Sequence, residues 1–183
     1  VRMTQLPTDV EEPQEAIVAE RARRLRSAGV LGMVAIEQLV KLAGEHDEQI
    51  YASGEQIIRQ GDSGESMFFI IDGEVVVSLN VPGKDQIQLR RLESGDYFGE
   101  MSLMTGEPRL ATVTATAETR VFEVTRSSFR EILEQQPGLI KQIGDNIHRR
   151  LIEKEEAVDS ARSQHLGETS SDILTRIKEF FRL

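Results

Sequence analysis

The stretch from Phe98 to Val113 contains the residues best suited to bind a ligand. Gly99 allows a sharp turn and a close approach of the backbone to a ligand, because glycine has no Cβ. Residues 100–104 suit one short helical turn, whose first N–H groups have no partner within the helix and attract an anion. Pro108 ends this turn, and the planar guanidinium of Arg109 that follows can hold two phosphate oxygens at once.

The carboxylate of Glu100 adds a second kind of chemistry to the same stretch. It would repel a phosphate but accept a hydrogen bond from a sugar hydroxyl, so the stretch predicts a pocket for a sugar phosphate. Each residue also has a simpler explanation when taken alone. Arg109 could form a surface ion pair with Glu107 or Glu118, and Glu100 could stabilise a helix start through its charge.

The order of these residues resembles the phosphate-binding cassette of cyclic-nucleotide-binding domains. The cassette pattern is Gly99-Glu100-x-Ser102-Leu103 followed by Pro108-Arg109-x-Ala111-Thr112. Upstream, the resemblance continues through Gly54-Glu55-x-Ile57-Ile58-x-Gln60-Gly61-Asp62, Met67-Phe68-x-Ile70 and Gly73-x-Val75. It extends over residues 30–158 and rests on the combined pattern, since a single Gly-Glu or Pro-Arg pair would carry no information.

The resemblance implies a cyclic nucleotide as ligand, with Arg109 on the phosphate and Glu100 on the ribose 2′-hydroxyl. Arg150, on a lid helix, is expected to stack on the purine or simply to lie in solvent. The other expected contacts are the main chain of Gly99, Met101, Ser102, Leu110 and Ala111, a hydroxyl of Ser102 or Thr112, and the base-side residues Val77 and Leu89. No catalytic residue, metal ligand or cofactor is predicted.

The resemblance also bears on the choice of base. In the family, a hydroxyl directly after the cassette arginine favours guanine by accepting a hydrogen bond from its exocyclic amine. Here that position is Leu110, which has no hydroxyl. We therefore predict that the chain prefers cAMP and binds cGMP more weakly, by about 1 kcal/mol for the one missing hydrogen bond.

Composition limits the partners. The chain has 183 residues, a formal net charge of −9 and no cysteine, which excludes thiol chemistry. Acidic residues outnumber basic ones in residues 51–125, so no nucleic-acid partner is predicted, and an anion must be captured by local donors. No apolar run is long enough to cross a bilayer. Because the chain starts at Val1 rather than at Met, we expect a piece of a longer protein.

The pattern of apolar residues predicts a mainly β fold with flanking helices. Short strand-like runs separated by glycines fill residues 46–125 and indicate a closed or double-sheet roll. The resemblance implies that this roll is an antiparallel jelly-roll (double-stranded β-helix) barrel. We assign Gly54, Gly61, Gly64 and Gly73 to tight corners of this roll. The flanking segments are an N-terminal arm with helices over 1–45, hinge and lid helices over 126–158, and a linker with an amphipathic C-terminal helix over 159–183.

Several classes of protein compete for this pattern. An enzyme is not expected, because the three histidines, His46, His148 and His165, are too scattered for a metal cluster. The favoured function is a regulatory domain that transmits ligand binding to an attached effector, a bacterial membrane channel of the cyclic-nucleotide-gated or mechanosensitive type. The alternatives are a sensor of a transcription regulator, for which the C-terminal remainder is too short, and a degenerate interaction domain. A kinase regulatory subunit would carry a second cassette, which is absent here.

The location follows from this choice of function. We predict a cytoplasmic domain, with the cytoplasmic part of an inner-membrane protein as the alternative. A homo-oligomer is left open. The C-terminal helix is expected to pack on its own chain or on a neighbouring copy rather than on a membrane, because its polar face has mixed charge.

Overall fold

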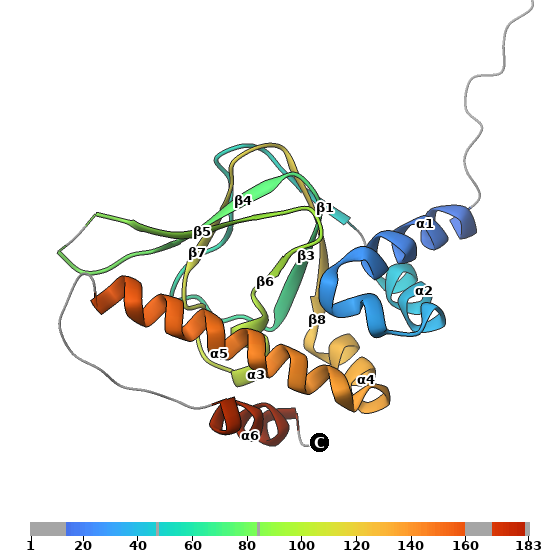
Figure 1. The fold of residues 1–183 in the computed structure, drawn as a ribbon. Helices are drawn as coiled ribbons and strands as arrows, with labels where there is room; N and C mark the ends of the chain where they lie inside the picture. The colour runs from blue at the N-terminus through green and yellow to red at the C-terminus, as the bar shows by residue number, and fades with distance from the viewer. Residues whose placement is uncertain (1–13, 47, 84, 160–169, 182–183) are drawn as a thin grey trace, which may run out of the picture.

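The structure is a computed structural model that describes residues 14–46, 48–83, 85–159 and 170–181. The described strands are β1 (Glu48–Tyr51), β2 (Gln56–Ile58), β3 (Ser66–Asp72), β4 (Glu74–Leu79), β5 (Ile87–Glu93), β6 (Tyr97–Phe98), β7 (Thr112–Ala115) and β8 (Thr119–Thr125). The helices are α1 (Gln14–Ser27), the 3-10 helix η1 (Gly29–Met33), α2 (Ile36–Glu45), α3 (Glu100–Thr105), α4 (Arg126–Gln135), α5 (Pro137–Asp159) and α6 (Ser170–Phe181). Figure 1 shows their arrangement.

The strands form two antiparallel sheets, each of four strands. One has the order β1-β8-β3-β6 and the other β2-β7-β4-β5. The predicted barrel is therefore correct in its antiparallel strands and flanking helices but not in its closure, since no ladder joins the two sheets within the described strands. The sheets instead share a core of apolar side chains that come from both of them: Ile58, Phe68, Ile70, Val75, Leu92, Phe98, Val113 and Val121.

Strand β3 separates two hydrophobic cores. Successive side chains of a strand point to opposite faces. Phe68 and Ile70 accordingly belong to the core between the sheets, whereas Met67 and Phe69 pack against the helices. All four side chains are buried, which explains why this strand has a continuous apolar run instead of an alternating pattern. Because β3 contacts both cores, it connects the interior of the roll directly to the helical layer.

The starts of the helices that follow the roll agree with their residue types. Thr125 is the N-cap of α4, and its hydroxyl accepts from the Ser128 N–H. Pro137 begins α5, as suits a residue that has no N–H to leave unpaired. Helix α6 starts at Ser170, and Asp172 places a negative charge in its first turn, where the helix dipole favours it.

Helix α5 runs along one edge of the roll, and α6 lies against it (Figure 1). Both N-terminal helices, α1 and α2, lie at the other end of the molecule beside β8 and α4 (Figure 1). None of the helices in the described ranges is long and apolar enough to cross a membrane. The predicted arm over residues 1–13 and the linker over residues 160–169 lie outside the described residues.

The position of β3 between the two cores gives a prediction about stability. Replacing Phe69, which is fully buried, with alanine leaves a cavity and is expected to lower the free energy of unfolding by about 3–5 kcal/mol. The matched control is Ile50→Ala, because the side chain of Ile50 is 59% exposed and its loss should change stability by less than about 0.5 kcal/mol. Urea denaturation measures both, and equal losses would contradict the assigned core.

Candidate functional site

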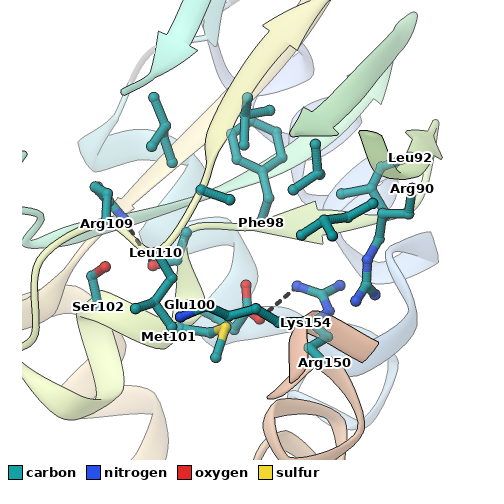
Figure 2. Close-up of a pocket in the computed structure, with 16 residues that line it drawn as sticks. Arg90, Leu92, Phe98, Glu100, Met101, Ser102, Arg109, Leu110, Arg150 and Lys154 are labelled. Atoms are coloured by element: carbon teal, nitrogen blue, oxygen red, sulfur yellow. Dashed lines mark hydrogen bonds and ion pairs between the residues drawn. The ribbon is translucent and has the colours of Figure 1, made fainter. Parts of the chain in front are cut away.

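A narrow pocket lies between the roll and α5 (Figure 2). Its free volume is about 70 Å³, which is room for roughly five water molecules. Four elements close it: β4 and β5 on one side, the α3 segment on another, and α5 at its mouth. The lining residues are Ile58, Val77, Leu89, Arg90, Leu92, Phe98, Gly99, Glu100, Met101, Ser102, Arg109, Leu110, Ala111, Val113, Arg150 and Lys154.

Nearly all of the residues predicted from the sequence line this one pocket. They are Val77, Leu89, Gly99, Glu100, Met101, Ser102, Arg109, Leu110, Ala111 and Arg150. The exception is Thr112, whose hydroxyl accepts a hydrogen bond from the backbone N–H of Gln60 at 3.1 Å. Thr112 therefore supports the segment beside the pocket, and of the two hydroxyls considered only that of Ser102 lies at the pocket wall.

The guanidinium of Arg109 is buried at one end of the pocket, with only 7% of the residue exposed. Its Nη1 donates to the carbonyls of Ser66, at 2.7 Å, and Gly99, at 2.8 Å, and its Nη2 donates to the Ser66 hydroxyl at 3.3 Å. These partners are neutral oxygens, so they orient the cation without cancelling its charge. They also leave the Nε–H free of any partner within the described part of the chain.

The backbone at Arg109 is fixed as firmly as its side chain. Its N–H donates to the carbonyl of Asp62 at 2.7 Å, and its carbonyl accepts from the N–H of Gly61 at 2.8 Å. Arg109 does not belong to a strand, since β7 begins only at Thr112. The two main-chain bonds to a neighbouring loop therefore fix its backbone. Burial lowers the pKa of Arg109 below its ordinary value.

Two glycines make room for this guanidinium. Gly99 has a φ of 82°, and a Cβ there would lie 2.8 Å from Nη1 of Arg109. Gly64 was predicted to serve only a tight corner, which is wrong. Its φ is not positive, and a Cβ at this position would overlap the Nε and Cζ atoms of Arg109. The reason for a glycine here is close approach to the arginine, a tertiary contact that the local sequence does not reveal.

Glu100, at the start of α3, is 1% exposed and faces the lid helix. Its Oε1 pairs with Nη1 of Arg150 at 2.5 Å. Arg150 in turn donates from Nη2 to the carbonyl of Tyr97 at 2.9 Å, and its Cζ lies 4.8 Å from the centre of the Tyr97 ring. Burial is the largest single influence and lowers the pKa of Arg150, but Glu100, Tyr97 and Asp96 together outweigh it, so the pKa is raised. Arg150 therefore lies in the pocket as a paired cation, not in solvent.

Two further cations at the pocket were not predicted. Arg90 on β5 lines the wall and pairs with Glu153 of α5, and Lys154 projects from α5 toward the mouth (Figure 2). A shift in the β4–β5 register at Leu89 explains why Leu89 and Arg90, although adjacent, both reach the pocket. Strict alternation would have put Arg90 on the opposite face. Burial lowers the pKa of Arg90, and the nearby Arg150 lowers it further.

The contact of Gly64 with Arg109 gives a prediction. Gly64→Ala should force the guanidinium out of its place and lower the free energy of unfolding by about 1–3 kcal/mol, as overpacking does in a full core. Gly138→Ala is the matched control, since a Cβ at that position meets nothing within 4 Å, and it should be neutral or slightly stabilising. Chemical denaturation compares the two. A Gly64→Ala variant as stable as the parent would show that Arg109 does not occupy this place.

A family model described as cyclic nucleotide-binding domain matches residues 48–136. Among curated proteins, the cAMP-dependent protein kinase regulatory subunit of Eremothecium gossypii is 38% identical over 109 residues, which cover 60% of this chain and 23% of that protein. The cGMP-dependent protein kinase egl-4 of Caenorhabditis briggsae is 32% identical over 123 residues, which cover 66% of this chain and 16% of that protein. The matched region is thus less than a quarter of each of these two relatives.

Solved structures agree with this match. The regulatory domain of Toxoplasma gondii PKA, crystallised with cAMP, superposes with a TM-score of 0.65 at 26% identity, and the match covers 72% of this chain and 51% of that one. The matched region contains both sheets, α3 and α4, and therefore the buried Arg109 and Glu100. The chain belongs to the cyclic nucleotide-binding domain family through residues 48–136.

Proposed function

We propose that the chain is a regulatory domain that binds a cyclic nucleotide in the pocket between the roll and α5. The observation that carries the proposal is the buried Arg109 guanidinium, which is held by neutral oxygens at the pocket wall and keeps a full positive charge. A cyclic phosphodiester carries one negative charge, so a single arginine neutralises it. Charge-assisted hydrogen bonds of this kind are roughly twice as strong as neutral ones.

The carboxylate of Glu100 suits the ribose. Because Oε1 already pairs with Arg150, the carboxylate is held in one orientation, and Oε2 can accept from a 2′-hydroxyl. A buried carboxylate without a partner would destabilise the protein, so the ion pair with Arg150 is what stabilises this acceptor inside the pocket. Phosphate and sugar would therefore be recognised by opposite charges on either side of Gly99, the arginine and the carboxylate.

The base would lie along the apolar wall made by Val77 and Leu89. A cyclic nucleotide is much larger than the few water molecules that the pocket can hold, so α5, with Arg150 and Lys154, must withdraw for it to enter. A bound nucleotide would then touch both the roll and α5. The nucleotide would bind more tightly when α5 is in one position than when it is in another. This difference in affinity would shift α5 toward the favoured position, and the shift would be passed to the effector.

The preference for cAMP over cGMP belongs to the same proposal. The side chain of Leu110 lines the pocket directly after Arg109 and offers no hydrogen-bond partner to an exocyclic amine of guanine. Both the cAMP-dependent and the cGMP-dependent kinases are among the matched relatives, so relatedness alone does not choose between the ligands. The chemistry of position 110 is what favours cAMP.

Residues 46–125 would form the binding unit and residues 126–158 the moving hinge and lid, with an effector attached elsewhere in the parent chain. The sequence suggested a bacterial membrane channel as effector. The curated relatives reported above are instead a kinase regulatory subunit and a cyclic-nucleotide-dependent kinase, which gives the channel no support. We therefore propose transmission to an effector without specifying its class.

Removing either charged partner of the nucleotide tests the pocket. Arg109→Ala and Glu100→Ala should each weaken cAMP binding by about 1–3 kcal/mol, because each leaves a polar group of the ligand unpaired in a buried site. Arg91→Ala is the matched control, since Arg91 lies one residue beyond the pocket residue Arg90 and its side chain is 58% exposed. Isothermal titration calorimetry gives the three affinities.

Arg109 also supports the fold, so a variant that keeps the charge is needed. Arg109→Lys retains the cation but loses the planar fork and is expected to bind cAMP with an affinity between those of the parent and Arg109→Ala. Thermal unfolding without ligand checks that each variant is folded. If folded Arg109→Ala and Glu100→Ala both bind as the parent does, the proposed pocket is wrong.

A second prediction concerns the base. Leu110→Thr introduces a hydroxyl at the pocket wall and should raise the affinity for cGMP relative to cAMP by about 1 kcal/mol, the value of one hydrogen bond. Leu110→Val removes a similar volume without adding a hydroxyl and serves as the control. Titration of both variants with both nucleotides gives the ratios, and an equal change in the two variants would remove position 110 from base selection.

A further inference from the structure

Helix α6 lies beyond the family match of residues 48–136 and packs on two elements of the pocket at once. It contacts α5, the lid helix, and α3, the helix that begins at Glu100. Figure 1 shows it lying below both. Ile173 and Ile177 are completely buried in this contact, so the amphipathic face predicted from the sequence packs within its own chain.

On the α5 side, the contact depends on a glycine. Leu174 packs so closely on Gly144 that a Cβ there would lie 2.6 Å from Cδ2 of Leu174. Gly144 lies in the part of α5 between its start at Pro137 and Arg150. The same helix therefore contacts α6 through Gly144 and the pocket through Arg150, about two turns further along.

On the α3 side, α6 contacts the residues that lead into Arg109. Arg176 forms an ion pair with Glu107 at 2.6 Å, and the ring of Phe180 covers Gly106, where a Cβ would overlap it. Gly106 has a φ of 73° and ends α3. Phe180 also lies 4.1 Å from the guanidinium of Arg126, at the start of α4. These contacts hold the cassette from the side opposite the pocket.

We propose that α6 is a clasp that fastens α3 to α5 and so stabilises the arrangement in which Glu100 and Arg150 meet. A helix that binds two elements in one relative position favours that position over others. The coupling is reciprocal: if the clasp supports nucleotide binding, then a bound nucleotide strengthens the clasp. This second half rests on the proposed function, whereas the fastening of α3 to α5 does not.

The order of α6 is a suitable readout. Its twelve residues are too few for a stable isolated helix in water, so α6 is expected to remain helical only while it is docked. Hydrogen–deuterium exchange of the whole chain therefore reports docking through the amides of α6, and the state of the pocket through those of α3 and α5.

The first experiment needs no ligand. Ile177→Asp places a charge in the buried face of α6 and should release it, and exchange should then increase in α3 and α5 as well as in α6. Thr175→Asp introduces the same side chain on the exposed face of this helix and should leave all three unchanged. An increase confined to α6 would overturn the clasp.

A milder variant covers the case in which Ile177→Asp fails to fold. Leu174→Ala removes the side chain against Gly144 while keeping the helix, and it should raise exchange in α3 and α5 in the same sense but to a smaller extent. If α6 exchanges faster in this variant while α3 and α5 keep the rates of the parent, the clasp is likewise excluded.

The second experiment adds cAMP. In the parent, cAMP should slow exchange in α6. Release of α6 by Ile177→Asp should weaken cAMP binding about fivefold or more, which is the lower end of typical allosteric coupling. Leu174→Ala takes its place if Ile177→Asp does not fold. Unchanged or tighter binding with α6 released would overturn the coupling. If the parent binds no cAMP, the proposed function is refuted. The exchange measured without ligand would then be the test of whether α6 fastens α3 to α5.

Discussion

The structure depends on one constraint, which is the need to hold a guanidinium inside the protein by hydrogen bonds to neutral oxygens rather than to a carboxylate. A buried charge is costly unless hydrogen bonds replace its water. Arg109 meets this requirement through the carbonyls of Ser66 and Gly99, which come from β3 and from the turn before α3. A carboxylate partner would stabilise the cation more strongly, but it would also cancel the charge that attracts an anion. Neutral hydrogen-bond partners therefore leave the positive charge of Arg109 available to an anion.

The same partners tie the pocket to the rest of the fold. Phe68 follows Ser66 on β3 and stacks on Phe98, at 5.3 Å between ring centres, directly before Gly99. Phe69 packs on the helical side of the same strand, against Tyr97. The carbonyl of Tyr97 also accepts a hydrogen bond from Arg150 of α5. One set of contacts therefore joins β3, the cassette and the lid helix. A change at the Arg109 end of the pocket thus has a short physical route to α5.

Much of the pocket could be predicted from the sequence because its members lie in one contiguous stretch. Gly99, Glu100 and Arg109 carry their chemistry in their residue types, and the order in which they occur is specific. Arg150 lies further along the chain, and its pairing with Glu100 was missed because an arginine on a charged helix looks the same whether it is solvated or buried. Only the packing of α5 on the roll distinguishes these cases.

Other features could not be predicted, because they arise where distant segments meet. Gly64 resembles the corner glycines in sequence, yet its role is set by a side chain 45 positions away. Arg90 reaches the pocket through an irregularity in the β4–β5 register, which no alternation pattern encodes. Thr112 looked like a ligand contact, but the backbone of Gln60 uses its hydroxyl. The docking of α6 likewise depends on Gly144 within α5 and on Gly106 directly after α3.

The central claim, that Arg109 holds the phosphate of a cyclic nucleotide, is tested most directly by NMR of the arginine side chains. The parent chain, with 15N-labelled arginine, is titrated with cAMP, and the Nε–H resonance of Arg109 is assigned by its absence in Arg109→Lys. A saturable downfield shift of this resonance is expected, as for an N–H that gains an anionic acceptor. An unchanged resonance at millimolar cAMP would contradict the account.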